Sequence, residues 1–265
     1  MAAWSLGQTA GWGLAVALGL MTVVWIGSLI RRDASLVDRV WGLGFVVLGW
    51  FYWWTAPVAD LTAVRALSVG LVSIWGLRLS AYLTWRNWGH GEDYRYRAMR
   101  ARGGAAFPFM NLATVHYLQG LIMWFVSLPL MLAARGLAPV RHPAVWAGVV
   151  LWGIGFGFEA IGDWQLIRFK SDSANQGKVL DRGLWRYTRH PNYFGDACAW
   201  WGFYAFAVAA GGWWTIVSPA VMTGLLLKVS GVALLEKQLT QTKPRYRDYI
   251  ARTSSFFPRP PRPAA

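Results

Sequence analysis

The sequence is poor in charge and almost devoid of cysteine. Only 14% of its 265 residues are charged, against roughly 25% in ordinary soluble domains. Cys198 is the single cysteine, which excludes an intrachain disulfide and a cysteine-based metal site. The four histidines form no i, i+4 pair and no grouping with glutamate, so no metal site is expected. These shortages argue against both a soluble globular protein and a metalloprotein.

Acidic residues are the rarer charges. Twelve Asp and Glu stand against 26 Lys and Arg, a formal net charge of +14. On a soluble protein this balance would indicate nucleic acid as a partner. Here the basic residues lie between long apolar runs, so the expected partners are membrane lipids with anionic headgroups and an anionic cofactor, not nucleic acid. No obligate protein partner is evident.

Apolar runs are abundant, in keeping with a hydrophobic content of 55%. A helix needs about 20 apolar residues to cross a ~30 Å hydrocarbon layer, and backbone groups inside lipid must be satisfied within the segment. The sequence therefore predicts an all-α, polytopic membrane protein with seven transmembrane helices. The predicted spans are 10–30, 40–57, 63–84, 115–134, 144–164, 193–210 and 213–235.

Basic residues are distributed unevenly around these spans. None precedes Arg31, so the first span lacks the basic start of a cleaved signal peptide. With the N-terminus outside, Arg65, Arg135 and Arg141 lie near outer ends, and all other Lys and Arg lie in or close to inner segments. The positive-inside rule thus predicts an outer N-terminus and a cytoplasmic C-terminus. Size and the lack of eukaryotic sorting motifs favour a bacterial inner membrane.

The spans are expected to form a single membrane domain over residues 1–265, since no linker is long enough to separate two domains. The segment 259–265 is basic and proline-rich and is expected to be disordered. Gly153, Gly155 and Gly157 lie in the fifth span. Small residues at close spacing in a membrane helix favour tight helix contact over phosphate binding.

Four acids near inner span ends are candidate functional residues, because ionisable groups at membrane depth are costly. They are Asp38, Glu159, Asp163 and Asp196. Glu159 and Asp163 lie four residues apart on one helix face and need nearby cations, for which Arg168 and Lys170 are available. A polar pocket is favoured there; helix-end charges that touch lipid headgroups are the alternative.

The densest polar segment runs from Gly183 to Asp196 and carries arginine, histidine and asparagine just before the sixth span. Such donors suit recognition of phosphate groups. Pro191 is a typical first helical residue, and the N–H groups after it add a site for an anion. Ordinary positive-inside anchoring would explain the arginines but not the neighbouring His190, Asn192 and Asp196. A ligand site is therefore favoured.

This segment resembles the membrane-bound steroid 5-alpha-reductase family, in particular its compact bacterial-type branch. The resemblance is strongest over about 160–202, is weaker over 75–120, and returns at Tyr249 and Pro258, with Arg252 between them. The best-matching residues are Asp163, Gly183, Leu184, Tyr187, Asn192, Gly195, Asp196 and Trp200, with Arg78, Tyr82 and the run 118–120 from the weaker region. The Arg-His-Pro-Asn-Tyr core over 189–193 is shared with isoprenylcysteine-type membrane methyltransferases, so that core fixes the superfamily and not the reaction.

The resemblance implies an NADPH-dependent reductase that saturates the carbon–carbon double bond of an α,β-unsaturated ketone lipid, with a Δ4-3-ketosteroid as the expected substrate. Residues 1–135 would form the substrate cavity, and 144–258 would hold the cofactor. Gln119 and His116 are the expected substrate contacts. With the polar residues of the segments above, the set expected to bind NADPH is Arg78, Tyr82, Arg86, Asn87, Glu159, Asp163, Arg168, Lys170, Tyr187, His190, Asn192, Asp196 and Arg252.

The catalytic pair implied by the resemblance is a glutamate and a tyrosine that hydrogen-bond the substrate carbonyl. Asp38 is the acid nearest the glutamate position, and Trp75 stands at the tyrosine position, although an indole has an N–H donor and no hydroxyl. Hydride transfer builds negative charge on the carbonyl oxygen, where one donor contributes about 3–4 kcal/mol. We therefore predict that Asp38 is protonated by burial and polarises the enone.

Two rival functions remain open. A methyltransferase that uses S-adenosylmethionine and acts on a lipid or prenylated substrate would share the Arg-His-Pro core, but such enzymes commonly carry paired glutamates near the C-terminus. Here Glu236 is followed by Lys237. A non-catalytic lipid-binding or transport protein would be expected to show repeated halves with interrupted helices, and the sequence shows neither. The reductase is the favoured function.

Overall fold

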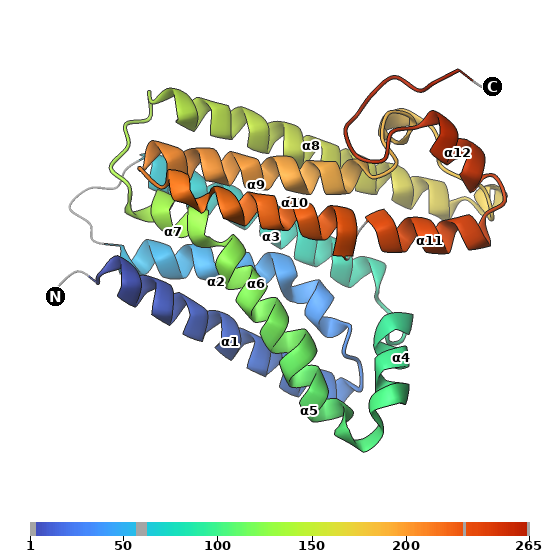
Figure 1. The fold of residues 1–265 in the computed structure, drawn as a ribbon, viewed down its shortest axis with the longest axis horizontal. Helices are drawn as coiled ribbons and strands as arrows, with labels where there is room; N and C mark the ends of the chain where they lie inside the picture. The colour runs from blue at the N-terminus through green and yellow to red at the C-terminus, as the bar shows by residue number, and fades with distance from the viewer. Residues whose placement is uncertain (1–3, 57–62, 230–231, 264–265) are drawn as a thin grey trace. The chain divides into compact units, whose positions relative to one another are not determined.

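The computed structural model describes residues 4–56, 63–229 and 232–263, and all regular secondary structure in these ranges is helical. The chain divides into two compact units (Figure 1). Unit 1 comprises residues 1–142 and 206–218, and unit 2 comprises residues 143–205 and 219–265.

Four helical stretches are long and apolar enough to cross a membrane: Leu6–Arg31, Val64–Arg86, Tyr94–Arg135 and Pro143–Ser171. They support an all-α integral membrane protein. The second and sixth predicted spans fall on helices of 20 and 19 residues. Residues 58–62, between the second and third predicted spans, lie outside the described residues, as do residues 230–231 of the seventh predicted span.

The first part of unit 1 consists of α1 (Leu6–Arg31), α2 (Leu36–Thr55) and α3 (Ala63–Arg86). A capping box starts α1: the Ser5 hydroxyl accepts from the N–H of Gln8, whose side chain accepts from the N–H of Ser5. In α2 and α3, a Cβ atom at Gly42 or Gly76 would overlap the other residue's main-chain carbonyl. Glycine therefore lets these two helices approach at backbone distance.

The rest of unit 1 is a succession of short helices: α4 (Tyr94–Gly103), α5 (Phe107–Asn111), α6 (Leu118–Val126) and α7 (Leu128–Arg135). Asp93 starts α4, because its carboxylate accepts from the main-chain N–H of Arg95 at 2.9 Å. A π-helical turn over Leu112–Tyr117 joins α5 to α6. Such widened turns are rare and frequently mark functional sites.

Unit 2 contains α8 (Pro143–Ser171) and most of α9 (Pro191–Ala209). A Cβ at Gly155 would lie 2.5 Å from the main-chain nitrogen of Ala199 in α9, so close packing of the two helices requires glycine there. No atom lies within 4 Å of a Cβ built on Gly153 or Gly157. The predicted role in helix packing is thus confirmed for Gly155 and is wrong for its two neighbours, which point away from the contact.

The chain ends with α10 (Val217–Gly224), a π-helical turn over Leu225–Val229, α11 (Val232–Thr242) and α12 (Tyr246–Arg252). The predicted disorder of 259–265 is not found at two of its residues. The N–H of Arg259 donates to the carbonyl of Tyr187 at 3.0 Å, and that of Arg262 donates to the carbonyl of Arg252 at 2.9 Å. Main-chain hydrogen bonds of this kind order a proline-rich segment even where it has no regular secondary structure.

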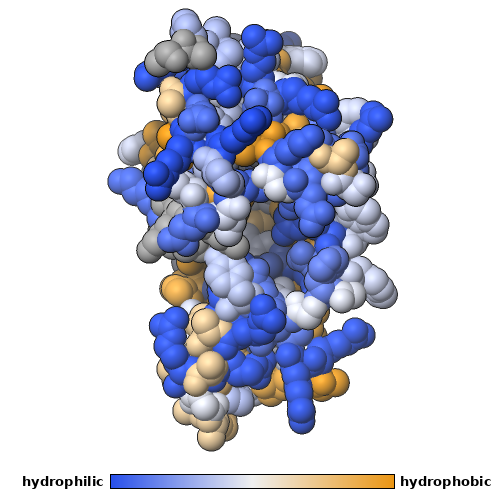
Figure 2. All heavy atoms as spheres, turned by 90° about the vertical axis from the view of Figure 1, so that its right-hand side faces the viewer, coloured by the Kyte–Doolittle hydropathy of each residue, from blue (hydrophilic) through white to orange (hydrophobic). Residues whose placement is uncertain are grey.

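Large apolar side chains are exposed on several helices, as expected for surfaces that face lipid. Examples are Val23, Ile30 and Trp54, which are 66%, 79% and 76% exposed. Figure 2 shows a face on which hydrophilic side chains predominate instead. The exposed surface of this protein therefore includes both lipid-compatible and water-compatible regions.

Candidate functional site

The side chain of Asp38, in the first turn of α2, meets two residues of α4. Its Oδ2 atom accepts from the Arg95 guanidinium at 2.9 Å, and its Oδ1 atom accepts from the Tyr96 hydroxyl at 2.8 Å. Asp38 and Arg95 are both half-buried, and Tyr96 is buried. An acid and a tyrosine separated by 58 residues in the sequence are thus in direct contact.

The local structure of α4 holds this arrangement. The Arg95 Nε atom donates to the capping residue Asp93 at 3.0 Å, so one arginine bridges Asp93 and Asp38. Burial acts to raise the pKa of Asp93, but the hydrogen bonds from Arg95 outweigh it and hold that pKa below its usual value. The cap that starts the helix therefore also fixes the cation beside Asp38.

Gln119, at the start of α6, extends the cluster. Its side chain lies beside Tyr96, and its Oε1 atom accepts from the indole of Trp41, one turn after Asp38 in α2. Of the residues predicted to act on the substrate, the structure therefore brings Gln119 together with Asp38 through Tyr96. We call Asp38, Trp41, Arg95, Tyr96 and Gln119 the acid–tyrosine cluster.

Trp75 is not a hydrogen-bond partner of Asp38 among the described residues. It is fully buried, with its ring 5.8 Å from that of Phe45. The hydroxyl beside Asp38 belongs to Tyr96, a residue that sequence reasoning missed. The sequence did contain a signal: Asp93 can cap a helix that has Tyr96 in its first turn. The arginines of the same segment drew attention to charge instead.

The protonation of Asp38 stays a prediction, because burial of its carboxyl group favours the neutral form, whereas its partners favour the ionised form. Both carboxylate oxygens accept hydrogen bonds, and a guanidinium at 2.9 Å favours the ionised form. The ionised Asp38 is an acceptor that orients Tyr96, and the group that can turn a proton toward a ligand is the Tyr96 hydroxyl.

His116, the second predicted substrate contact, lies in the π-helical turn and is fully buried. Its Nδ1 atom lies 3.2 Å from the carbonyl of Asn111. Within the described residues, neither the His116 Nε2 atom nor the Asn111 side-chain amide has a hydrogen-bond partner. Buried polar atoms without partners are costly, so this turn offers donors and an acceptor to a water or to a polar group of a ligand.

Three predicted cofactor residues lie along the C-terminal half of α3, and a fourth, Asn87, follows directly after it. The guanidinium groups of Arg78 and Arg86 lie 5.4 and 5.5 Å from the centre of the Tyr82 ring. Asn87 accepts from Arg86 at 3.4 Å. An aromatic ring between two cations is a favourable cation–π arrangement and presents two positive charges on a single helix.

In unit 2, the predicted acids gather where α8 and α9 pack. The Asn192 amide donates to Asp163 at 3.3 Å. Glu159 and Asp163 are 3% and 2% exposed, and both engage in further interactions. Asp196 follows Asn192 by one turn of α9. This buried set of carboxylates and an amide can accept and donate hydrogen bonds to hydroxyl and amide groups of a ligand.

Arg189 and His190 occupy a different environment, because both bind Glu236 of α11. The Arg189 Nε atom donates to the Glu236 carboxylate at 2.7 Å, and the His190 Nε2 atom lies 3.1 Å from the same oxygen. Arg189 also donates to the carbonyls of Ile250, at 3.1 Å, and Thr253. Burial acts to raise the pKa of Glu236, but His190 and Arg189 hold it below its usual value. We call Arg189, His190 and Glu236 the C-terminal clamp.

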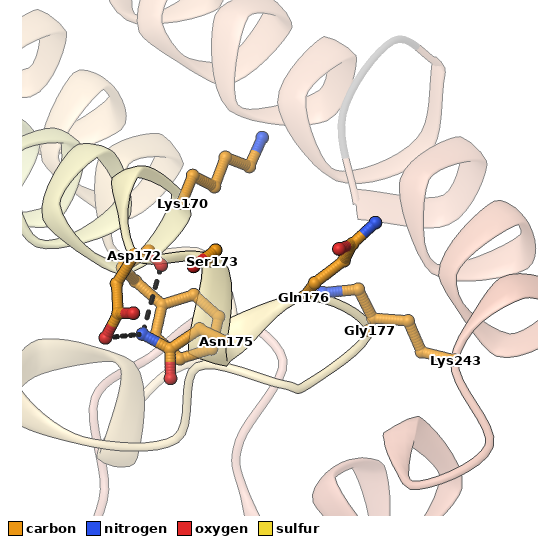
Figure 3. Close-up of a pocket in the computed structure, with 8 residues that line it drawn as sticks. Lys170, Asp172, Ser173, Asn175, Gln176, Gly177 and Lys243 are labelled. Carbon is orange, nitrogen blue, oxygen red and sulfur yellow. Dashed lines mark hydrogen bonds between the residues drawn. The ribbon is translucent and has the colours of Figure 1, made fainter.

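A cavity of about 430 Å³ lies at the C-terminal end of α8 (Figure 3). Lys170, a predicted cofactor residue, lines it together with Lys243, which sequence reasoning did not single out. Burial lowers the pKa of Lys243, whose ammonium group donates to the carbonyl of Lys178. The remaining lining residues are Phe169, Asp172, Ser173, Asn175, Gln176 and Gly177. Two ammonium groups and several amide and hydroxyl groups suit a phosphate-bearing ligand.

The other predicted cofactor residues are exposed and lie apart from the α8–α9 acids. Arg168 lies 5.1 Å from the Trp164 ring, and Arg252 lies 3.9 Å from Asp181. Tyr187 is 43% exposed, and its carbonyl accepts from Arg259. These three side chains are accessible to a ligand without being held in a single cluster.

Long apolar helices with polar clusters between them are those of an integral membrane protein. Residues 24–253 match the model of a family described as "Protein of unknown function (DUF1295)", and the chain belongs to that family. It is also 25% identical to an uncharacterized protein of Schizosaccharomyces pombe, over 93% of this chain and 79% of the relative. No solved structure matches it.

Proposed function

We propose that this protein is an NADPH-dependent reductase of the steroid 5-alpha-reductase type, which saturates the carbon–carbon double bond of an α,β-unsaturated ketone lipid. The observation that carries the proposal is the 2.8 Å hydrogen bond between Asp38 and Tyr96. An acid–tyrosine pair that acts on the substrate carbonyl is what the resemblance to that family implies.

Tyr96 is the proposed donor to the substrate oxygen. In the proposed step Asp38 is protonated and donates to the Tyr96 oxygen, so that rotation about the Cζ–Oη bond turns the Tyr96 proton to a carbonyl oxygen. Negative charge develops on that oxygen as the β-carbon is reduced, and a positioned donor stabilises it. A proton from water then reaches the α-carbon and completes the addition of two hydrogens across the double bond.

The rest of the acid–tyrosine cluster positions Tyr96. Asp38 hydrogen-bonds its hydroxyl and Gln119 lies beside it, and Arg95 offsets the charge of Asp38 at 2.9 Å. The cluster therefore remains close to neutral when it receives a hydrophobic substrate, which limits the cost of desolvating it. His116 and Asn111 are proposed to meet a second polar group of the substrate.

NADPH supplies the hydride when it is bound. The proposed binding residues have the chemistry that the cofactor needs. Asp163 and Asn192 offer a carboxylate and an amide to ribose or nicotinamide groups, and Lys170 and Lys243 offer ammonium groups to a phosphate at the cavity of Figure 3. Cationic and polar donors of this kind are typical of phosphate recognition.

The proposed membrane arrangement is seven spans with an outer N-terminus and a cytoplasmic C-terminus, in a bacterial inner membrane. The distribution of Lys and Arg supports it. The four apolar helical stretches are consistent with part of this topology, and α2, α9 and the segment 213–235 are the proposed remaining spans. A lipid substrate would then partition from the bilayer, while NADPH would come from the cytoplasm.

The rival function is a methyltransferase that uses S-adenosylmethionine. Glu236, the C-terminal acid that such an enzyme would need, is engaged by both Arg189 and His190, which favours the reductase. Addition of NADPH or S-adenosylmethionine to the purified protein, with its thermal unfolding as the readout, separates the two. Stabilisation by S-adenosylmethionine alone would contradict the reductase.

The decisive experiment incubates the purified protein with NADPH and a Δ4-3-ketosteroid and analyses the product by mass spectrometry. The expected product has gained two hydrogens. The Asp38→Leu variant removes the partner that orients Tyr96 and should lose this activity. Full turnover by Asp38→Leu, with correct folding shown by an unchanged melting temperature, would remove the acid–tyrosine cluster from the mechanism.

A further inference from the structure

The C-terminal segment of unit 2 encloses a second cavity, of about 400 Å³. Its lining includes four arginines and two serines: Arg189, Arg252, Arg259, Arg262, Ser254 and Ser255. Among the described residues, no Asp or Glu lines it. A concave, strongly basic and hydroxyl-bearing surface is suited to an anion.

Main-chain hydrogen bonds fix the walls of this cavity. The N–H of Arg189 donates to the carbonyl of Ser254 at 2.9 Å, and the N–H of Arg262 donates to the carbonyl of Arg252 at 2.9 Å. The segment therefore folds back on α12 as a closed loop. A preformed site of this kind loses little conformational entropy when a ligand binds.

The charges of the four arginines are balanced to different degrees. Glu236 lies 2.7 Å from Arg189, and Asp181 lies 3.9 Å from Arg252. In the described part of the chain, neither Arg259 nor Arg262 has a carboxylate within ion-pair distance. Two guanidinium groups without acidic partners, beside two serine hydroxyls, form a donor set that favours a phosphate ester.

An exposed aromatic residue lies in the chain between Ser255 and Arg259, which both line the basic cavity. Phe257 is 59% exposed, whereas its neighbour Phe256 is buried, with the two rings 5.4 Å apart. Large aromatic side chains of membrane proteins are enriched at the membrane–water interface, and arginines near that interface attract anionic lipids. A phosphate ester that carries acyl chains would contact both Phe257 and the arginines, whereas a free phosphate would contact the arginines alone.

We propose that this cavity binds the headgroup phosphate of an anionic phospholipid and so holds the C-terminal segment at the membrane surface. The site is separate from the residues proposed above for NADPH, apart from Arg252, and it does not require the reductase activity.

The experiment measures thermal stabilisation of the purified full-length protein in detergent by four probes: dihexanoyl phosphatidylglycerol, dihexanoyl phosphatidylcholine, inorganic phosphate and NADPH. Phosphatidylglycerol should stabilise the protein most, because its net charge and acyl chains match the site. The double variant Arg259→Gln/Arg262→Gln should weaken phosphatidylglycerol binding about tenfold or more and leave the NADPH affinity unchanged. Arg245→Gln/Arg247→Gln is the matched control, since these exposed residues of the same segment do not line the cavity.

Several results would overturn the proposal. An equal loss of phosphatidylglycerol binding in the control would mean that only overall charge matters. A loss of NADPH binding with phosphatidylglycerol binding retained would assign the cavity to the nucleotide. If the double variant does not fold, Ser255→Asp serves instead: it keeps the arginines, adds an exposed carboxylate at the cavity and should also weaken phosphatidylglycerol binding.

A further variant separates lipid from free phosphate. Phe257→Ser should narrow the difference in affinity between phosphatidylglycerol and inorganic phosphate, and an unchanged difference would contradict the role of the acyl chains. If the wild-type protein binds no NADPH at all, the proposed reductase function fails, while the phosphatidylglycerol result stands or falls by itself.

Discussion

The acid–tyrosine cluster of unit 1 and the C-terminal clamp of unit 2 use similar chemistry for different ends. In each, an arginine lies within 3 Å of a carboxylate that also contacts a second polar side chain. The Arg189 guanidinium of the clamp also donates to main-chain carbonyls of Ile250 and Thr253. In the acid–tyrosine cluster, the second group is the Tyr96 hydroxyl. The clamp therefore fixes the main chain of the C-terminal segment, whereas the acid–tyrosine cluster contains a hydroxyl proton that can be offered to a ligand.

This difference shows that density of polar residues along the sequence is a poor guide to chemistry. The segment from Gly183 to Asp196 is the richest in donors, yet much of it anchors the C-terminus. Thr188 donates to the carbonyl of Phe256 at 2.8 Å, and Tyr249 donates to that of Trp185. The acid–tyrosine pair, by contrast, is spread over two helices 58 residues apart.

The largest expected effect is on the stability of unit 2. Arg189→Ala leaves Glu236 of α11 without its main cation and removes the hydrogen bonds from Arg189 to the carbonyls at the end of α12. The free energy of unfolding should therefore fall by about 3–5 kcal/mol. Thermal or denaturant unfolding in detergent measures this loss. Arg186→Ala, an exposed arginine three residues earlier, is the control and should change little. Loss of NADPH binding without loss of stability would make Arg189 a ligand-binding residue rather than part of a clamp.

The next effect concerns activity and tests unit 1. Tyr96→Phe removes the proposed donor but keeps the ring, so kcat for enone reduction should fall by about 10²–10³-fold with little change in melting temperature. Tyr94→Phe makes the same change at a tyrosine of the first turn of α4 that is 46% exposed, and it should retain activity. Equal activity of the two variants would show that Tyr96 has only a structural role, as the C-terminal clamp does.

A smaller effect tests the α8–α9 frame that carries the buried acids. Gly155→Ala places a Cβ 2.5 Å from backbone atoms of α9 and should cost about 1–3 kcal/mol through overpacking. Gly153→Ala, with no atom within 4 Å, should be neutral or slightly stabilising because alanine favours helix. Unfolding curves of the two variants give the comparison, and equal stabilities would mean that the helices do not meet at Gly155.

The smallest effect is a dependence on pH. Because the folded-state pKa of Glu236 lies below its ordinary value of 4.5, its ion pairs stabilise the protein fully above that pH, and the stabilisation is lost as the pH falls through the folded-state pKa. Melting temperatures measured between about pH 6 and pH 3 should fall less steeply in Glu236→Gln than in the wild type. Parallel curves would indicate that Glu236 is not ionised in the clamp.

Part of the candidate site was predictable from residue types alone. Asp38 and Asp163 were identified because acids near membrane depth are costly unless they have a role, and Asn192 because it lies in the polar segment from Gly183 to Asp196. The partner of Asp38 was not predictable, because Trp75 was chosen by counting along one helix, whereas Tyr96 reaches Asp38 from another. The disorder predicted for the tail also failed in part, since composition does not reveal main-chain bonds such as that from Arg259 to Tyr187.

The sequence by itself determined that the protein is helical and belongs in a membrane, because long apolar runs leave the backbone no other way to satisfy its hydrogen bonds in lipid. It also supplied every ionisable group that a site could use. The tertiary structure decided which of these groups meet: Arg95 lies with Asp38, Arg189 with Glu236, and Tyr96 between an acid and an amide. Such contacts depend on helix ends, caps and close glycine packing, which local sequence patterns do not encode over tens of residues.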